Sequence, residues 1–184
     1  VVKKNDTLVI IDDSIVRGTT LKKSILKMLD RLEPEKIVIV SSAPQIRYPD
    51  CYGIDMANLD SLVAFNAALE LLKDRNMSHL IKEIYEKCKT ELELEDAEMT
   101  NQVKAIYNPF TAQEISDKIT ELLSSDLEKR DVKIIFQSIE DLHKACPNSR
   151  GDWYFTGDYP TPGGNRVVNT AFVNFFEGNK KRAY

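Results

Sequence analysis

The chain has 184 residues, of which 42% are hydrophobic and 29% charged, and it carries a formal net charge of -4. This size and composition suit one globular domain, or one domain with an insertion. The acidic balance argues against nucleic acid as a general partner, and no stretch approaches the roughly 18 apolar residues of a membrane span. The three cysteines are widely spaced, which favours reduced thiols over a disulfide framework or a zinc site. Together with the absence of a signal-peptide pattern, this predicts a cytoplasmic protein.

The first predicted strand, at residues 7–11, leads into two adjacent carboxylates, Asp12 and Asp13. Its unbroken apolar run is typical of a strand buried on both faces of a parallel sheet. A short loop follows, in which Gly18 allows close backbone approach to a ligand. Thr19 and Thr20 then offer hydroxyl and N–H donors where a helix begins, an arrangement that favours an anion. Since carboxylates repel a phosphate, we expect the two aspartates to hold sugar hydroxyls or a divalent cation. The alternative is that they merely cap the helix.

The apolar residues between positions 20 and 31 fall at helical spacing, and Pro34 ends that pattern. Residues 36–41 form a second apolar strand, so residues 7–41 are predicted to form one right-handed β-α-β unit. The loop at residues 42–56 leaves the same edge of the sheet, and its side chains can therefore reach the same crevice. Alternatively, this loop is a structural connection that contains a buried tyrosine.

Helical patterns dominate the middle of the chain, and a third strand follows at residues 131–136. Residues 58–89 are predicted to form two helices, with Ser78 capping the second. A further helix begins at the capping box of Thr111 and Glu114, and a short one begins at Ser138. His143 lies on that short helix, where the sequence indicates no nucleophile or metal as its partner. Residues 162–164 (Pro-Gly-Gly) are predicted to form a turn before a last helix around residues 172–176.

Several of these motifs together resemble a known family. The run Asp-Asp-Ser-Ile-Val-Arg-Gly-Thr-Thr at residues 12–20 resembles the phosphoribosyl-pyrophosphate (PRPP) signature of the type I phosphoribosyltransferases. With Ser-Ala-Pro at 42–44, Arg-Tyr-Pro at 47–49, Tyr-Gly-Ile-Asp-Met at 52–56 and Phe-Thr-Gly-Asp-Tyr-Pro-Thr at 155–161, the chain is similar to the amidophosphoribosyltransferases. The matching stretches lie within residues 7–66 and 131–161.

The resemblance implies a fold and a division of the chain. The fold is α/β, a partial three-layer structure with a mostly parallel sheet of the type I phosphoribosyltransferase kind. Residues 1–66 and 130–184 would form part of that domain, and residues 67–129 a mostly helical insertion. Because the chain starts without methionine and its best motif begins almost at once, we expect a piece of a longer chain. The pyrophosphate loop and the flexible catalytic loop would precede Val1, so the piece alone should be inactive.

The resemblance also implies an activity. The whole enzyme would transfer glutamine-derived ammonia to C1 of PRPP, giving 5-phosphoribosylamine and pyrophosphate, the first step of de novo purine synthesis. Its implied partners are PRPP and purine nucleotides, an N-terminal glutaminase domain of the same parent chain, and further copies in a homo-oligomer. The alternative is a non-catalytic module that senses PRPP or a nucleotide.

The resemblance assigns binding roles by position and assigns no catalytic residue within this chain. Asp12 and Asp13 would bind the ribose hydroxyls and Mg²⁺. The 5′-phosphate would lie against Arg17, Gly18, Thr19 and Thr20, with Ser14 beside them.

Some family members hold an iron–sulfur cluster through cysteines just before the Phe-Thr-Gly run. Here residues 149–153 contain no cysteine, and only Cys146 is close. Because such clusters are normally held by four thiolates, we expect no iron–sulfur cluster.

Overall fold

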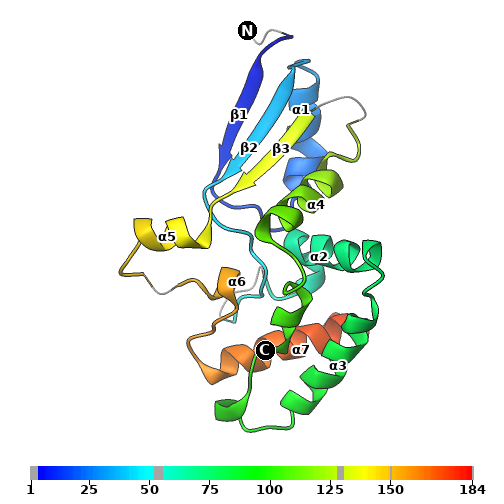
Figure 1. Cartoon of the computed structure of the whole chain (residues 1–184), viewed down its shortest axis with the longest axis vertical. Coiled ribbons are helices and arrows are strands. Elements are labelled where there is room, and N and C mark those ends of the chain that lie inside the picture. The colour runs from blue at the N-terminus through cyan, green and yellow to red at the C-terminus, as the bar shows by residue number, and fades with distance from the viewer. Residues whose placement is uncertain (1–3, 52–55, 128–130, 150, 184) are drawn as a thin grey trace.

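A three-stranded parallel sheet forms one end of the molecule (Figure 1). The computed structural model describes residues 4–51, 56–127, 131–149 and 151–183. The strands β1 (Thr7–Asp12), β2 (Lys36–Ser41) and β3 (Asp131–Phe136) lie in the order β1-β2-β3. Both pairings are parallel. The predicted α/β class with a parallel sheet is confirmed, as are the positions of the strands.

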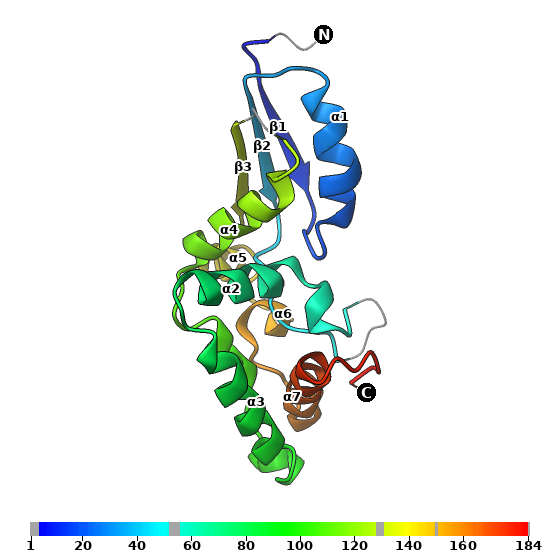
Figure 2. The same ribbon diagram turned by 90° about the vertical axis from the view of Figure 1, so that its right-hand side faces the viewer.

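Helices cover one face of this sheet within the described residues (Figure 2). A π-helical stretch, η1 (Leu21–Ile25), continues into α1 (Leu26–Asp30), and α4 (Ala112–Ser124) lies beside them. Ile37, Ile39 and Ile134 point to this covered face and are buried. The described residues therefore form two of the three predicted layers, namely the sheet and one layer of helices.

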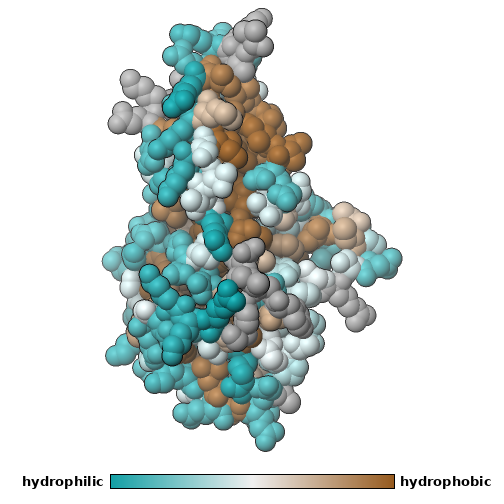
Figure 3. All heavy atoms as spheres, turned by 180° about the vertical axis from the view of Figure 1, so that it is seen from behind, coloured by the Kyte–Doolittle hydropathy of each residue, from teal (hydrophilic) through white to brown (hydrophobic). Residues whose placement is uncertain are grey.

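The other face of the sheet is open in this part of the chain. Because strand side chains alternate between faces, the residues between the buried ones point outward. Val9 and Ile11 are 61% and 75% exposed, and Ile135 is 41% exposed. The prediction of strands buried on both faces is therefore wrong for the described residues, since α1 and α4 pack on the same side. Apolar surface also gathers at the sheet end on the side that carries α1, as seen from behind in Figure 3. Met28 of α1 is 59% exposed.

The opposite end of the molecule is helical. It contains α2 (Val63–Asp74), α3 (His79–Glu91) and α7 (Pro162–Phe176), with the short helices η2 (Leu59–Ser61), η3 (Asp96–Glu98) and η4 (Gln102–Ile106). Phe65 of α2 is fully buried and packs edge-to-face on Phe172 and Phe175 of α7, with ring centroids 6.1 and 4.9 Å apart. These aromatic contacts bring α2 and α7 into one core although they lie far apart in the sequence. None of the described helices is both long and apolar enough to cross a membrane.

Several predicted helix boundaries can be compared with the structure. The two helices expected within residues 58–89 are α2 and α3, but the Ser78 side chain makes no capping hydrogen bond. The capping box of Thr111 and Glu114 is present at α4, and Ser138 caps α5 (Ile139–Ala145). The stretch 67–129 includes α4, which packs against both β3 and α2. The predicted domain boundaries themselves stay a prediction.

The predicted turn at residues 162–164 is wrong, because these residues form the first turn of α7. Pro162 stands at the start of the helix, where its missing N–H costs nothing. Packing requires a glycine at position 164, because a Cβ there would lie 2.5 Å from the Tyr159 side chain. Pro162 and Gly164 are therefore compatible with the start of a helix, although their local sequence is typical of a turn.

Candidate functional site

The loop after β1 borders a hollow of about 750 Å³ at the carboxyl end of the sheet, here called the loop hollow. Its lining includes Asp12, Ser14, Arg17, Gly18, Thr19 and Thr20, with Ile46 and Met56 from the loop after β2. Six of the seven predicted binding residues therefore surround one cavity. Asp13, the seventh, borders a different cavity. The roles assigned to these residues stay predictions.

Packing against α4 and α2 holds the loop in place. Gly18 has φ +67°, which side chains other than glycine rarely adopt, and a Cβ there would lie 2.6 Å from Cδ2 of Leu123. The Val63 amide donates to the Val16 carbonyl at 2.9 Å, and Ile15 is buried beneath the loop. The loop conformation is thus fixed by long-range contacts as well as by the glycine.

The helix that follows begins with hydrogen-bond donors near the cavity. The Lys22 amide donates to the Gly18 carbonyl at 2.8 Å, so the helical hydrogen bonds start at the loop itself. Thr20 has helical backbone angles, and its side chain makes no capping hydrogen bond. Its exposed hydroxyl is therefore not used to cap the helix and lies on the lining of the loop hollow.

The two aspartates interact with the backbone and with each other. The Asp13 amide donates to Oδ1 of Asp12 at 3.0 Å, and the Ser14 amide donates to Oδ1 of Asp13 at 2.8 Å. Burial raises the pKa of Asp12, and the neighbouring Asp13 side chain raises it further. The folded protein therefore favours the charged form of Asp12 less than water does, and a nearby cation or hydroxyl donors would offset this.

Two carboxylates offer the oxygen ligands that Mg²⁺ prefers, and this ion usually takes its remaining ligands from water and substrate. Among the described residues, no group of three or more His, Cys, Asp or Glu side chains could hold a metal ion by itself. Asp12 and Asp13 could therefore hold Mg²⁺ only if water or substrate oxygens supplied the remaining ligands.

The loop after β2 is anchored by tyrosines. The Tyr107 hydroxyl donates to the Arg47 carbonyl, and the Tyr159 hydroxyl donates to the Pro49 carbonyl, each at 2.6 Å. Tyr48 is buried and packs edge-to-face on Tyr107, with ring centroids 5.4 Å apart. These contacts agree with a structural connection that holds a buried tyrosine, although the same loop also reaches the loop hollow. Residues 52–55 of the Tyr-Gly-Ile-Asp-Met motif lie outside the described residues.

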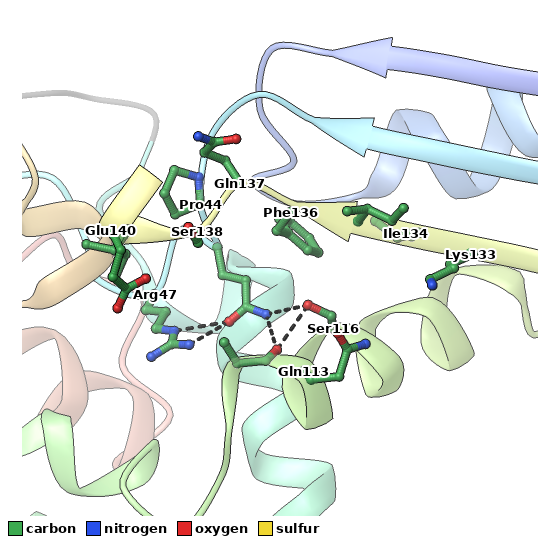
Figure 4. Close-up of a pocket in the computed structure, with 14 residues that line it drawn as sticks. Pro44, Arg47, Gln113, Ser116, Lys133, Ile134, Phe136, Gln137, Ser138 and Glu140 are labelled. Carbon is green, nitrogen blue, oxygen red and sulfur yellow. Dashed lines mark hydrogen bonds between the residues drawn. The ribbon is translucent and has the colours of Figure 1, made fainter. Parts of the chain in front are cut away.

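A separate cavity of about 440 Å³ lies between β3, α4 and the start of α5 (Figure 4). On its lining, Nε2 of Gln45 donates to the Ala112 carbonyl and to Oγ of Ser116, both at 2.7 Å. Nε and Nη2 of Arg47 donate to Oε1 of Gln45 at 3.1 and 2.7 Å. These polar groups bind one another and hold the loop against α4. None of residues 12–20 lines this cavity, so it is distinct from the predicted site.

Comparison with known proteins relates the sequence to one family, although no protein-family model matches it. The chain is 47% identical over 62 residues to amidophosphoribosyltransferase of Haemophilus influenzae, a match that covers 34% of this chain and 12% of that protein. It is 33% identical over 123 residues to the Saccharomyces cerevisiae enzyme, covering 62% of this chain and 24% of that protein. Over these stretches the chain is similar in sequence to the amidophosphoribosyltransferases.

These matches cover only part of each protein. The Escherichia coli amidophosphoribosyltransferase, for example, is 36% identical over 70 residues, which are 38% of this chain and 14% of that protein. The matched stretches therefore span less than a quarter of the length of these three relatives. The resemblance to the amidophosphoribosyltransferases inferred from the motifs is confirmed.

A third cavity, of about 240 Å³, adjoins Asp13 in this amidophosphoribosyltransferase-like chain. It is here called the His143 hollow, and its lining includes Asp13, Ser42, Pro44, Leu142, His143, Cys146, Ser149, Asp152 and Phe155. Nε2 of His143 lies 2.9 Å from Oδ2 of Asp152. The sequence showed no sign of this pair, because the two residues are separated by the turn after α5 and only the fold brings them together.

Proposed function

We propose that this chain is part of an amidophosphoribosyltransferase and that its loop hollow binds PRPP. The whole enzyme would transfer glutamine-derived ammonia to C1 of PRPP, releasing pyrophosphate and giving 5-phosphoribosylamine, the first step of purine synthesis. The observation that carries this proposal is the single cavity bordered by Asp12 and the loop from Ser14 to Thr20. That cavity places a carboxylate beside the anion-favouring start of a helix, as a phosphorylated sugar requires.

Each group in the loop hollow has a physical role in this proposal. The hydroxyls of Thr19 and Thr20, the nearby backbone amides and the guanidinium of Arg17 bind the 5′-phosphate. Asp12 in the loop hollow and Asp13 on the adjoining cavity would accept hydrogen bonds from the ribose hydroxyls and ligate Mg²⁺, which when bound would offset the charge of the pyrophosphate. The residues of this chain therefore bind and orient PRPP, so that their contribution to the transfer is positioning.

The proposal extends to partners and location. Glutamine hydrolysis belongs to a glutaminase domain outside this chain, purine nucleotides regulate the enzyme, and the whole protein is a cytoplasmic homo-oligomer. No iron–sulfur cluster is proposed. Among the three cysteines, Cys88 is buried, and burial raises the pKa of its thiol to about 12, which disfavours the thiolate that a cluster needs.

Binding of ribose 5-phosphate and PRPP to the 184-residue chain, measured by calorimetry with and without Mg²⁺, tests the proposal. PRPP binding should strengthen with Mg²⁺, and Arg17→Gln should weaken the binding of both ligands by at least about tenfold, the loss expected for one charge-assisted hydrogen bond. Arg31→Gln, at the exposed end of α1, is the matched control and should bind as the unsubstituted chain does. Equal binding by both variants would contradict the assignment.

Turnover separates the enzyme from the non-catalytic sensing module. A protein that joins this chain to the remaining length found in its relatives should release pyrophosphate from PRPP and ammonia. The 184-residue chain alone should bind PRPP without releasing pyrophosphate. Binding without turnover in both forms would favour the sensing module.

A further inference from the structure

The helix that follows the loop after β1 is fastened to the C-terminal end of α4. Nζ of Lys22, two residues after Thr20, donates to the Leu122 carbonyl at 2.9 Å and to Oγ of Ser125 at 2.7 Å. Leu122 lies in the last turn of α4, and Ser125 follows its last residue. Because the last carbonyls of a helix have no partner within the helix, the Lys22 side chain supplies a donor where one is needed.

The charges at this contact also favour it. The C-terminus of a helix carries a partial negative charge, which attracts the ammonium of Lys22. Oδ1 of Asp126 lies 3.7 Å from Nζ of Lys22, and Oδ2 of the same carboxylate lies 3.7 Å from Nζ of Lys27 on α1. The Lys22 side chain is 33% exposed and that of Lys27 is 51% exposed, so water screens the contact of Lys22 less.

The Lys22 ammonium is engaged by α4 and not by the loop hollow. Among the described residues that line this hollow, Arg17 is the one basic side chain, and Lys22 does not belong to the lining. A lysine this close in sequence to an anion-favouring loop could have reached the anion itself. The observed hydrogen bonds to α4 instead indicate that Lys22 acts on the loop and not on a ligand.

The loop itself meets the same end of α4. The Lys22 amide donates to the Gly18 carbonyl at 2.8 Å, so the backbone of this lysine is bonded to the loop while its side chain is bonded to α4. Leu123, between the two acceptor residues, lies so close to Gly18 that an added Cβ would meet its Cδ2 at 2.6 Å. The loop, the start of its helix and the end of α4 therefore form one closed set of contacts.

We infer that Lys22 is a positioning residue, which holds the amides and hydroxyls of the loop in place for a phosphate by binding the end of α4. This inference rests on the proposed function, because it concerns the phosphate end of the PRPP site. It gives the stretch 67–129, expected as an insertion, a part in that site. A loop that is already ordered loses less conformational entropy when its ligand binds, which raises the affinity.

Calorimetry of ribose 5-phosphate binding to variants of the 184-residue chain tests this role, at an ionic strength of about 0.15 M to screen exposed charges. Lys22→Met keeps the apolar stem and should weaken binding by about tenfold, the loss expected for one charge-assisted hydrogen bond. Lys22→Arg keeps a charged donor and should retain most of the affinity. Lys23→Met, the matched control, removes the same charge from an exposed position one residue on and should bind as the unsubstituted chain does.

Ser125→Ala distinguishes positioning from direct contact with the phosphate. If Lys22 acts through α4, this substitution should weaken binding, although less than Lys22→Met because the Leu122 carbonyl remains as an acceptor. In a Lys22→Met background it should have no further effect. If Lys22 binds the phosphate itself, Ser125→Ala should leave the affinity unchanged or raise it, and the inference is refuted.

The possible results separate this inference from the proposed function. Circular dichroism checks that each variant is folded, and Ser125→Ala alone carries the test if Lys22→Met does not fold. Unchanged binding by both Lys22→Met and Ser125→Ala refutes the positioning role and leaves the phosphoribosyl site standing.

If the unsubstituted chain does not bind ribose 5-phosphate, the proposed function fails, and hydrogen exchange still tests the attachment of the loop. The reporter is the Val63 amide, which donates to the Val16 carbonyl of the loop at 2.9 Å. This amide should exchange faster in Lys22→Met and at the unchanged rate in Lys23→Met. Equal exchange in both variants would show that Lys22 does not hold the loop.

Discussion

Gly18→Ala tests whether the loop after β1 depends on its packing against α4. Gly18 has φ +67°, and an added Cβ would lie 2.6 Å from Cδ2 and 3.0 Å from Cδ1 of Leu123. The left-handed conformation costs a non-glycine residue about 1–2 kcal/mol, and overpacking a buried contact typically adds about 1–3 kcal/mol. Leu123 is only 5% exposed, so it has little room to move. We expect the free energy of unfolding to fall by about 2–5 kcal/mol.

Gly178→Ala is the matched control, because it shares the backbone cost without the contact. Gly178 has φ +69°, and a Cβ there would meet nothing within 4 Å. The free energy of unfolding of Gly178→Ala should therefore fall by only about 1–2 kcal/mol. Urea unfolding followed by circular dichroism, with linear extrapolation to water, measures both variants. The difference between them isolates the contact with Leu123.

A double-mutant cycle with Leu123→Ala completes the test. In that background the side chain that obstructs the new Cβ is absent, so Gly18→Ala should again cost only about 1–2 kcal/mol. Gly18→Ala should also weaken ribose 5-phosphate binding, because relief of the contact moves the loop away from α4. The reasoning is refuted if Gly18→Ala and Gly178→Ala lose the same stability and the cycle shows no coupling with Leu123.

Three further substitutions each test the role of one side chain. Thr20→Ala should weaken ribose 5-phosphate binding by about tenfold or more in calorimetry, since a hydrogen bond to a charged group contributes on the order of 1.5–3 kcal/mol. Thr90→Ala, at an exposed position of α3, should have no effect. Because burial raises the pKa of Asp12, Asp12→Asn should leave the chain as stable or more stable at pH 7. Any gain should vanish below about pH 4, where the carboxyl is protonated in both folded and unfolded states; lower stability at pH 7 in urea unfolding would contradict this. Tyr107→Phe removes the 2.6 Å hydrogen bond to the Arg47 carbonyl, so the free energy of unfolding should fall by about 1–3 kcal/mol. Amide hydrogen exchange in the loop after β2 should become faster. Unchanged exchange would show that other contacts hold this loop.

The local pattern of the sequence determined the strands and most helix starts. Apolar runs placed β1, β2 and β3, and the capping box of Thr111 and Glu114 placed the start of α4. Such features depend on residues close together in the chain, whose backbone preferences and hydrogen bonds act over a few positions. The cluster of polar residues after β1 was visible for the same reason, since six of its members follow one another closely and line one cavity.

Tertiary packing decided the features that depend on distant residues. The sequence predicted a turn at Pro162, but packing of Gly164 against Tyr159 accommodates a helix start there. Apolar strands suggested two covered faces, yet both packing helices lie on the same one, as the exposed Ile11 shows. The same holds for His143 and Asp152, which meet only because the chain turns between them. Side-chain periodicity shows which residues can be buried together, but the partner that covers them is chosen by contacts between remote segments, and those contacts exist only in the folded chain.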